Sequence, residues 1–488
     1  MKDKHIPLQI GLVAMLVLAM SIAACTPFRP DVRTEPVAPL PVEYTMYSEA
    51  TPEPGKWWEA FGNEELNTMV EEALAANFDI VKAWATLRQA GASATQSSAD
   101  KYPTLDVTGG YSHTSSYDGD KKTDTQSESH SVGLSAGYEV DLWGRIQASA
   151  ASGDLDFQAS REDLNTTAMT VASEVVTRWV KIQSLRAKKR ILDGQIKSNA
   201  TYLELIELRY RNSISTALDV YQQRETLASV KAQVPPVESE EQILLHELAL
   251  LMGKPAGTIT VADADLPGLT DLPGLGLPAD LLASRPDVRS AGLKLSSADW
   301  AVSAARANRL PSLSLTGTGE FTGTQLATLF NNWALGLAAS VVGPIFDGGY
   351  RKAEVEKQLG LVDQRIAEYR ETVYTAFKEV EDALVQEKWQ KKYLEALSIQ
   401  EEASRTSLSE AITRYTQGLD DYLPVLTALL SVQSLELTLS DERKDLLLYR
   451  VDLHRALGGT WTDDIKPATV EDANASANVE TEQIKNEG

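Results

Sequence analysis

The chain has 488 residues, 24% of them charged, and a formal net charge of −23. Such an acidic chain lacks the basic surface with which proteins hold nucleic acid, so a nucleic-acid-binding role is excluded. The single cysteine, Cys25, excludes an intrachain disulfide and a cysteine-rich metal site. The length allows several ordinary domains or one large repeated one.

The N-terminus has the pattern of a processing signal. An apolar run from Ile10 to Met20 follows two lysines and is too short to cross a bilayer as a helix, so we interpret residues 1–24 as a signal peptide. Ile22-Ala23-Ala24-Cys25 resembles the lipobox of bacterial lipoproteins. That resemblance implies lipidation of Cys25, with palmitate among the acyl groups, and outer-membrane sorting. An ordinary signal peptide that contains a cysteine is the alternative.

Composition divides the rest of the chain. Residues 25–56 are proline-rich and predict a lipidated, extended N-terminal segment, and residues 255–286 repeat Pro and Gly and predict a linker. Residues 459–488 are acidic and polar and predict a disordered tail. Between these segments lie two copies of one unit, residues 57–254 and 287–458.

The evidence for an internal duplication is a set of matched positions. The offset between the copies stays near 205 to 208 residues, far longer than a solenoid repeat. The matches include Asp79 with Asp287, Tyr102-Pro103 with Leu310-Pro311, Arg209-Tyr210 with Arg414-Tyr415, and Met252-Gly253 with Leu457-Gly458.

Each copy contains two segments with strand periodicity. Apolar and polar residues alternate over about 104–113, 130–142, 311–322 and 332–343, which predicts strands with one apolar and one polar face. The segment 113–130 between the first two strands is polar and charged, and we expect a long loop. Long loops at one end and short connections at the other are typical of a membrane barrel. A soluble β-sandwich with one wet face is the alternative.

Four strands do not close a barrel, and an open sheet edge in lipid leaves backbone groups unsatisfied. If these strands span a membrane, other copies of the chain must complete the barrel. Three copies supply about 12 strands, enough for an open lumen. The fold class that we predict is an α+β membrane protein, a trimeric 12-stranded β-barrel continued by a long α-helical coiled-coil barrel.

Each copy ends in a long helical hairpin, predicted over 144–252 and 350–457. The first helix of each hairpin is free of proline over about 65 residues, which gives a length of roughly 100 Å, and its apolar residues recur with heptad spacing. An ordinary dimeric coiled coil is the alternative, but it does not explain the strands.

The turns of the two hairpins read RYRNSISTALDVY (209–221) and RYTQGLDDYLPVL (414–426). Gly418 suits the positive φ that ends a helix. The carboxylates of Asp420 and Asp421 suit helix capping, and Arg209 and Arg414 suit either the last helix carbonyls or a partner in a neighbouring hairpin.

The chain resembles the outer-membrane efflux channels of the TolC and OprM type, in the NodT-like lipoprotein branch. The resemblance covers about residues 57–460. The motifs that carry it are Trp57-Trp58, Phe61-Gly62-Asn63-Glu64-Glu65-Leu66, Tyr138-Glu139-Val140-Asp141-Leu142-Trp143-Gly144-Arg145, Ser284-Arg285-Pro286-Asp287-Val288, Pro344-Ile345-Phe346-Asp347-Gly348-Gly349 and Arg414-Tyr415 with Gly418.

The resemblance implies a homotrimer in the outer membrane of a Gram-negative bacterium, with a long periplasmic extension. Its expected partners are outer-membrane lipid, a periplasmic adaptor (membrane fusion protein) and an inner-membrane pump. An RND (resistance-nodulation-division) pump is favoured over ABC or MFS pumps. The implied function is passive export of drugs or other small solutes. The alternatives are the duct of a type I protein secretion system and a non-porous structural envelope lipoprotein.

The same resemblance places a periplasmic gate at the hairpin tips. We expect Asp420 at the constriction, where three copies would form an acidic ring as in cation-selective pores. The gate hypothesis names Arg414, Asp420, Asp421 and Tyr422. The hypothesis for the hairpin tips and adaptor docking names Arg209, Tyr210, Asn212, Ser213, Tyr415 and Gly418.

The sequence has no pattern of an enzyme, and we expect neither a cofactor nor a metal. His246 begins the sequence His-Glu-Leu-Ala-Leu, which lacks the second histidine of a zinc-protease motif. His113 and His130 fall in or beside the predicted external loop, where exposure to solvent is the expected role.

Overall fold

The computed structural model describes residues 28–30, 37–45, 55–269 and 272–466. The chain forms two compact units. The first combines the described residues up to Val37 with Thr86–Arg161 and Ser290–Glu371. The second combines the described residues of Ala38–Ala85 with Glu162–Arg289 and the described residues from Thr372 onward. Each unit takes residues from both predicted copies, so the sequence repeats are not separate bodies.

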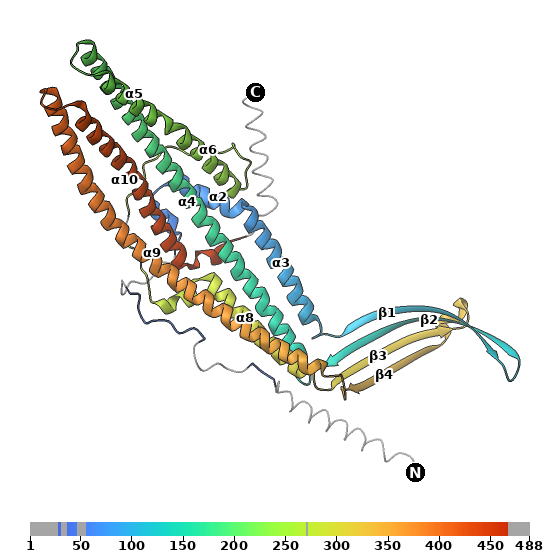
Figure 1. Cartoon of the computed structure of the whole chain (residues 1–488). Helices are drawn as coiled ribbons and strands as arrows, with labels where there is room; N and C mark the ends of the chain where they lie inside the picture. The colour runs from blue at the N-terminus through green and yellow to red at the C-terminus, as the bar shows by residue number, and fades with distance from the viewer. Residues whose placement is uncertain (1–27, 31–36, 46–54, 270–271, 467–488) are drawn as a thin grey trace. The chain divides into compact units, whose positions relative to one another are not determined.

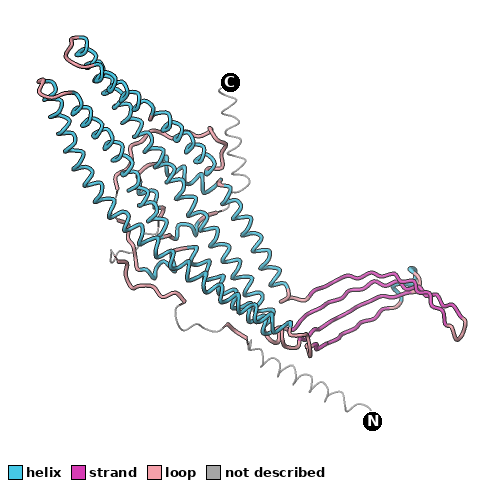
Figure 2. Tube along the Cα trace, in the orientation of Figure 1, coloured by secondary structure: helices cyan, strands magenta, loops and turns pink. Residues whose placement is uncertain are grey.

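The first unit contains one four-stranded antiparallel sheet in the order β1-β2-β3-β4 (Figures 1 and 2). A 3-10 helix, η3, connects the last two strands. The elements are β1 (Thr104–Asp118), β2 (Thr123–Val140), β3 (Ser312–Gly323), η3 (Leu326–Asn331) and β4 (Trp333–Val342).

The register gives the sheet two different faces. One row of residues paired across the sheet is Val107, Leu134, Gly319 and Leu335, and the other apolar rows lie on the same face. The rows between them lie on the opposite face and include Glu320. Every residue of β1 and of β4 is exposed. The predicted four-stranded sheet is therefore present, with its two outer strands uncovered.

The predicted loop 113–130 is wrong over most of its length. β1 and β2 continue through it as a hairpin, and only residues 119–122 form the turn. Seven of the 18 residues 113–130 are serine or threonine, and threonine in particular favours the extended backbone. Because both faces of the extension are polar, apolar alternation could not reveal it.

The helices of the first unit pack beside one another around a small apolar core. They are the later part of α3 (Phe78–Ala99), α8 (Pro286–Ala307) and the first turns of α4 (Arg145–Arg211) and α9 (Tyr350–Thr416). Leu295, Ala298 and Val302 of α8 meet Val362 of α9. Val37 joins this cluster, and its carbonyl accepts a 2.6 Å bond from Arg370 Nε.

The second unit contains most of the two helical hairpins. The first hairpin consists of α4, α5 and α6, and the second of α9 and α10 (Figure 1). The remaining bounds are η1 (Trp57–Phe61), α2 (Glu64–Ala76), α5 (Ala217–Ala232), α6 (Val234–Leu251), η2 (Pro278–Asp280), α7 (Leu281–Ser284), α10 (Tyr422–Leu457) and η4 (Thr460–Asp464).

The return arms of the two hairpins differ. The first arm is interrupted at Gln233, because Pro235 and Pro236 lack backbone N–H groups and fit only the first turn of a new helix. The second arm, α10, is continuous, and its Pro424 lies within the first turn.

The predicted linker and tail are partly ordered against the helices. The linker lies along α4: Gln183 Nε2 donates to the Ala262 carbonyl at 2.8 Å, and Arg190 pairs with Asp263 at 2.7 Å. The expectation of disorder from residue 459 is wrong for its first residues, because Trp461 packs edge-on against Trp58 at 4.7 Å. Cys25 and residues 467–488 lie outside the described residues.

One helix of the described chain, α10, is long and apolar enough to cross a bilayer by length and composition. The side chains of α10 that face the other helices are buried, including Tyr422, Val425 and Leu429. A core helix passes the same test, so this feature does not identify a membrane span.

Candidate gate at the hairpin tips

The two hairpin tips have the same backbone turn. Ile214 N donates to Arg209 O at 2.9 Å in the first tip, and Leu419 N donates to Arg414 O at 2.9 Å in the second. The left-handed residue is Ser213 (φ 61°) in one and Gly418 (φ 75°) in the other. This is the Schellman arrangement that ends a helix. The first tip forms it without glycine.

The second tip is closed by an ion pair within the hairpin. Arg414 Nε lies 2.5 Å from Asp420 Oδ2, and Nη2 lies 3.2 Å from Oδ1. The hydrogen bond from Arg414 lowers the pKa of the Asp420 carboxyl and raises the pKa of the guanidinium. Both side chains are accessible to solvent, so the pair shapes the loop without adding much to stability.

Caps at the start of the return helices differ between the tips. In the first, Thr216 and Asp219 form a capping box, and Ser215 Oγ also donates to Asp219 at 2.7 Å. Burial acts to raise the pKa of Asp219, but these hydrogen bonds outweigh it and lower the pKa. In the second, Asp421 occupies the N-cap position of α10 and makes no side-chain capping bond. The expected capping role of Asp420 is therefore replaced by its pair with Arg414.

A buried hydrogen-bond chain joins the two hairpins. Tyr422 Oη donates to Gln223 Oε1 at 2.6 Å, and Gln223 Nε2 donates to Asn199 O and Oδ1 at 2.9 and 3.0 Å. All three side chains are buried. Burial is the first cause that raises the pKa of Tyr422, with the nearby Tyr415 adding to it. The Tyr422 hydroxyl is therefore a neutral donor.

Arg209 and Tyr415 provide the second contact between the hairpins. The guanidinium carbon of Arg209 lies 4.4 Å from the ring centroid of Tyr415, within cation–π range. The Tyr415 ring lies 5.5 Å from that of Tyr422. Ile206 and Val220 of the first hairpin complete this buried cluster. Of the two roles considered for Arg209, contact with the other hairpin is the one present.

The structure brings together only some of the residues that the sequence suggested. Arg209, Tyr415 and Tyr422 meet between the hairpins, and Arg414 meets Asp420. The side chains of Tyr210, Asn212 and Ser213 are exposed at the first tip instead. Sequence reasoning missed Asn199 and Gln223. The signal for them in the sequence was weak. Asn199 has Ile196 and Leu203 at i−3 and i+4, and Gln223 has Val220 and Leu227 there, but other i±3 and i±4 positions of both residues are polar.

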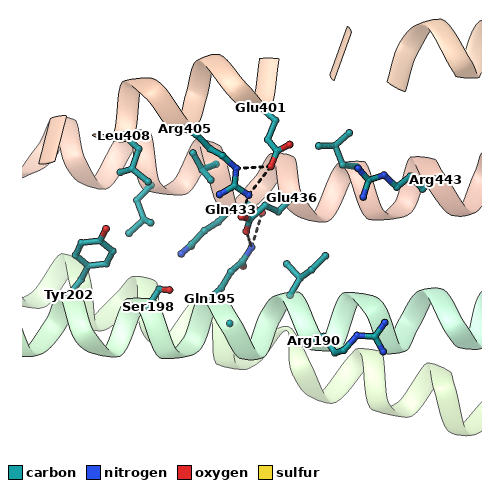
Figure 3. A pocket seen from close by; sticks show the side chains of 15 residues that line it. Arg190, Gln195, Ser198, Tyr202, Glu401, Arg405, Leu408, Gln433, Glu436 and Arg443 are labelled. Carbon is teal, nitrogen blue, oxygen red and sulfur yellow. Dashed lines mark hydrogen bonds and ion pairs between the residues drawn. The ribbon is translucent and has the colours of Figure 1, made fainter. Parts of the chain in front are cut away.

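A pocket of about 520 Å³ lies behind the tips, between α4 on one side and α9 with α10 on the other (Figure 3). Gln195 Nε2 donates to Gln433 O and Glu436 Oε2, both at 3.0 Å. Arg405 of α9 in turn reaches Glu436 at 2.5 Å. These bonds continue the polar connection between the hairpins away from the tips.

The sequence model of the outer membrane efflux protein family matches residues 69–254 and 277–459. The chain belongs to this family, whose members are outer-membrane efflux channels.

Curated relatives and solved structures support membership of the same family. The pyoverdine export outer membrane protein OpmQ of Pseudomonas aeruginosa is 33% identical over 84% of this chain and 88% of the relative. The cation efflux system protein CusC of Escherichia coli is 27% identical over 91% and 97%. The solved outer-membrane channel OprN superposes with a TM-score of 0.84 at 27% identity, over 89% of this chain and 99% of that one.

Proposed function

We propose that this chain is the outer-membrane exit duct of a tripartite efflux pump, which passes small solutes outward and closes at its helical tips. The observation that carries the proposal is the sheet with one apolar face and two uncovered outer strands, in a chain that also forms two joined helical hairpins. Family membership supports the same role.

The length of the sheet supports a membrane span. β2 and β3 pair over 11 positions, from His130 with Gly323 to Val140 with Leu313. A transmembrane strand needs about 9 to 11 residues. Because the edges of β1 and β4 are unpaired in one chain, lipid would require other copies to satisfy them, and three copies give about 12 strands. We therefore propose a homotrimer.

The N-terminal segment is long enough for a lipid anchor. Val37 packs against α9 near Arg370, about 30 Å along that helix from its start beside the sheet. The 12 residues from Cys25 to Val37 can extend to about 40 Å. This reach supports acylation of Cys25 at the membrane surface from which the sheet begins.

The internal duplication is supported by two observations of different kinds. The family model matches two successive segments of the chain, and the two tips share one hydrogen-bonded turn. We propose that both halves derive from one ancestral unit, and that the continuous α10 and the ion pair of the second tip are later differences between them.

Adaptor docking fits the first hairpin better than the second. A pocket of about 320 Å³ lies beside its tip, lined by Tyr210, Tyr221 and the pair Glu207–Arg224 among others. Exposed Ile214 and Leu218 extend the apolar part of this surface. We propose that the periplasmic adaptor docks there and that the inner-membrane pump, RND in preference to ABC or MFS, selects the solute.

The gate assignment makes a direct prediction about conductance. The change Asp420→Ala removes the partner of Arg414 and the carboxylate that three copies would bring to the constriction. Single-channel recording in planar bilayers should show a small conductance for the native protein and a larger one for the variant. The variant Asp193→Ala, at an exposed carboxylate on α4 away from the tips, is the matched control and should conduct like the native protein.

The same recordings separate the alternatives. A non-porous envelope lipoprotein would give no conductance in any form. Unchanged conductance in Asp420→Ala, with a pore present, would remove Asp420 from the gate and leave the duct role intact. A type I secretion duct has the same pore, and only transport of a protein rather than of small solutes in cells would favour it.

A further inference from the structure

Two of the five histidines in the sequence lie on the overhanging part of the β1–β2 hairpin. β3 ends at Gly323, which pairs with His130, so beyond His130 β1 and β2 pair only with each other among the described strands. The register places His113 opposite Glu128 and Tyr111 opposite His130. Positions 111 and 113 of β1 and positions 128 and 130 of β2 all face one side.

We propose that His113, Glu128 and His130 form a binding site for a divalent first-row metal ion such as Zn²⁺ or Cu²⁺. Glu128 and His130 are two residues apart on one strand, and His113 lies directly across from Glu128 and diagonally across from His130. Such cross-strand and diagonal neighbours lie about 5 to 8 Å apart at their backbones, within reach of side chains of this length. Two imidazoles and a carboxylate form a donor set that these ions accept, with water in the remaining position.

The side chains are close to this arrangement but have not converged. His113 Nδ1 lies 3.5 Å from Glu128 Oε1. The ring of His130 instead packs against Tyr111, with ring centroids 5.0 Å apart. In the present arrangement no group of three His, Cys, Asp or Glu side chains among the described residues is placed to hold a metal ion. One rotation of the His130 ring, from Tyr111 toward His113, is the movement that binding requires.

The surroundings keep the imidazole of His130 on the side of the row where Tyr111 and His113 lie. A Cβ placed on Gly323, the β3 neighbour of His130, would lie 2.9 Å from Leu329 Cα. The 3-10 helix η3 therefore occupies the β3 side of this row and leaves the β1 side for the imidazole. The alternate rows, Ser112 with Ser129 and Thr114 with Ser127, face the other side and present only hydroxyls, so the donors are confined to one face.

A metal here would tie β1 to β2 at the position where the pairing of β2 with β3 ends. The inference does not depend on the duct role, because it concerns a local site on a hairpin. A failed metal titration leaves the conductance prediction untouched, and a failed conductance measurement leaves the metal site untouched.

The experiment is calorimetric titration of the purified full-length protein with ZnCl₂ in detergent near neutral pH. We expect saturable binding of one ion per chain. His113→Ala or His130→Ala should each weaken it by roughly tenfold or more, and Glu128→Gln should weaken it less. Binding should also weaken as the pH is lowered, since protons compete for the imidazole nitrogens.

Two controls keep the result specific. The double change Ser112→Ala with Ser129→Ala alters the opposite face of the same strands, and His246→Ala removes an exposed helical histidine. Both should bind Zn²⁺ like the native protein. The proposal is overturned if no saturable binding occurs, or if binding persists undiminished in the His113→Ala/His130→Ala double variant. A Co²⁺-loaded sample whose visible spectrum is unchanged by that double variant would overturn it as well.

Discussion

At the scale of single residues, the joined tips depend on buried polar groups that bond across the two hairpins. The hydroxyl of Tyr422 is bonded to Gln223, and the two residues are 199 positions apart in sequence. The sequence marked Tyr422 as a tip residue because it follows Asp420-Asp421. The sequence alone could not identify Gln223 as the partner of Tyr422, because a hydrogen bond between residues so far apart in sequence depends on how the two hairpins pack.

Removing that hydroxyl should loosen the tips. In Tyr422→Phe the Gln223 carbonyl stays buried without its donor, which costs about 1 to 3 kcal/mol. We expect a lower thermal midpoint and more frequent channel openings in planar bilayers. Tyr202→Phe, which changes a half-buried tyrosine on α4 in the same manner, is the comparison. Equal effects in the two variants would show that the bond to Gln223 has no special role.

A half-buried histidine on α10 makes the free energy of unfolding depend on pH. His454 stacks on Trp57, with centroids 5.2 Å apart, and burial followed by the charge of Arg450 lowers its pKa to about 4. The unfolded chain, with an ordinary histidine pKa near 6.5, binds the proton more readily. The contribution of His454 to the free energy of unfolding is therefore fully present above about pH 6.5. It is lost as the pH drops toward 4, by about 3 kcal/mol in total.

Denaturation midpoints measured between pH 7 and pH 4 test this prediction. His454→Phe keeps an aromatic ring against Trp57 and removes the titration, so its midpoint should fall less steeply with acid. His246→Ala removes an exposed histidine and should keep the native slope. Identical slopes in native protein and His454→Phe would contradict the assignment.

At the scale of elements, both hairpins end in the same turn but with different residues at the left-handed position. The pattern of glycine before two carboxylates predicted the second turn correctly. Nothing in Asn-Ser-Ile-Ser marked Ser213 as its equivalent, because serine rarely adopts a positive φ without a local reason.

This difference predicts opposite effects from matched substitutions. Gly418→Ala forces a side chain into the left-handed region and should cost about 1 to 2 kcal/mol, whereas Ser213→Gly relieves that strain and should gain up to about 1 kcal/mol. Thermal midpoints of the two variants should move in opposite directions. A stabilised Gly418→Ala would show that the second turn relaxes to another conformation.

The second hairpin also contains an ion pair that is almost fully buried. Arg450 Nη2 of α10 lies 2.7 Å from Glu387 Oε1 of α9, and Lys391 reaches the same carboxylate. Burial acts to raise the pKa of Glu387, but its bonds to Arg450 and Lys391 outweigh burial and lower it. The pair fixes the register between the two helices.

Removing the charge of one partner should lower the free energy of unfolding more than replacing both side chains with apolar ones. Arg450→Met leaves a buried carboxylate with less compensation and should destabilise by about 3 to 5 kcal/mol. Adding Glu387→Leu should restore a large part of that loss, which a double-mutant cycle on unfolding would measure. Additive losses would indicate that the two side chains act independently.

At the scale of the whole molecule, periodicity predicted the four strands, the two hairpins and the matched tips, because each depends on a local pattern of apolar residues. Three features could not be predicted from apolar periodicity. The polar extension of β1 and β2 has no apolar face, the break at Gln233 depends on a proline pair inside an apolar repeat, and each compact unit combines residues from both copies. The last is a property of packing and has no local signature.

The uncovered edges of β1 and β4 cannot be satisfied in lipid by one chain, and the proposed homotrimer depends on them. Native mass spectrometry of the detergent-extracted, mature protein measures directly how many chains associate. We expect a complex of three chains that dissociates only when the detergent-solubilised protein unfolds. A folded single chain that stays soluble without detergent would contradict the proposed homotrimer.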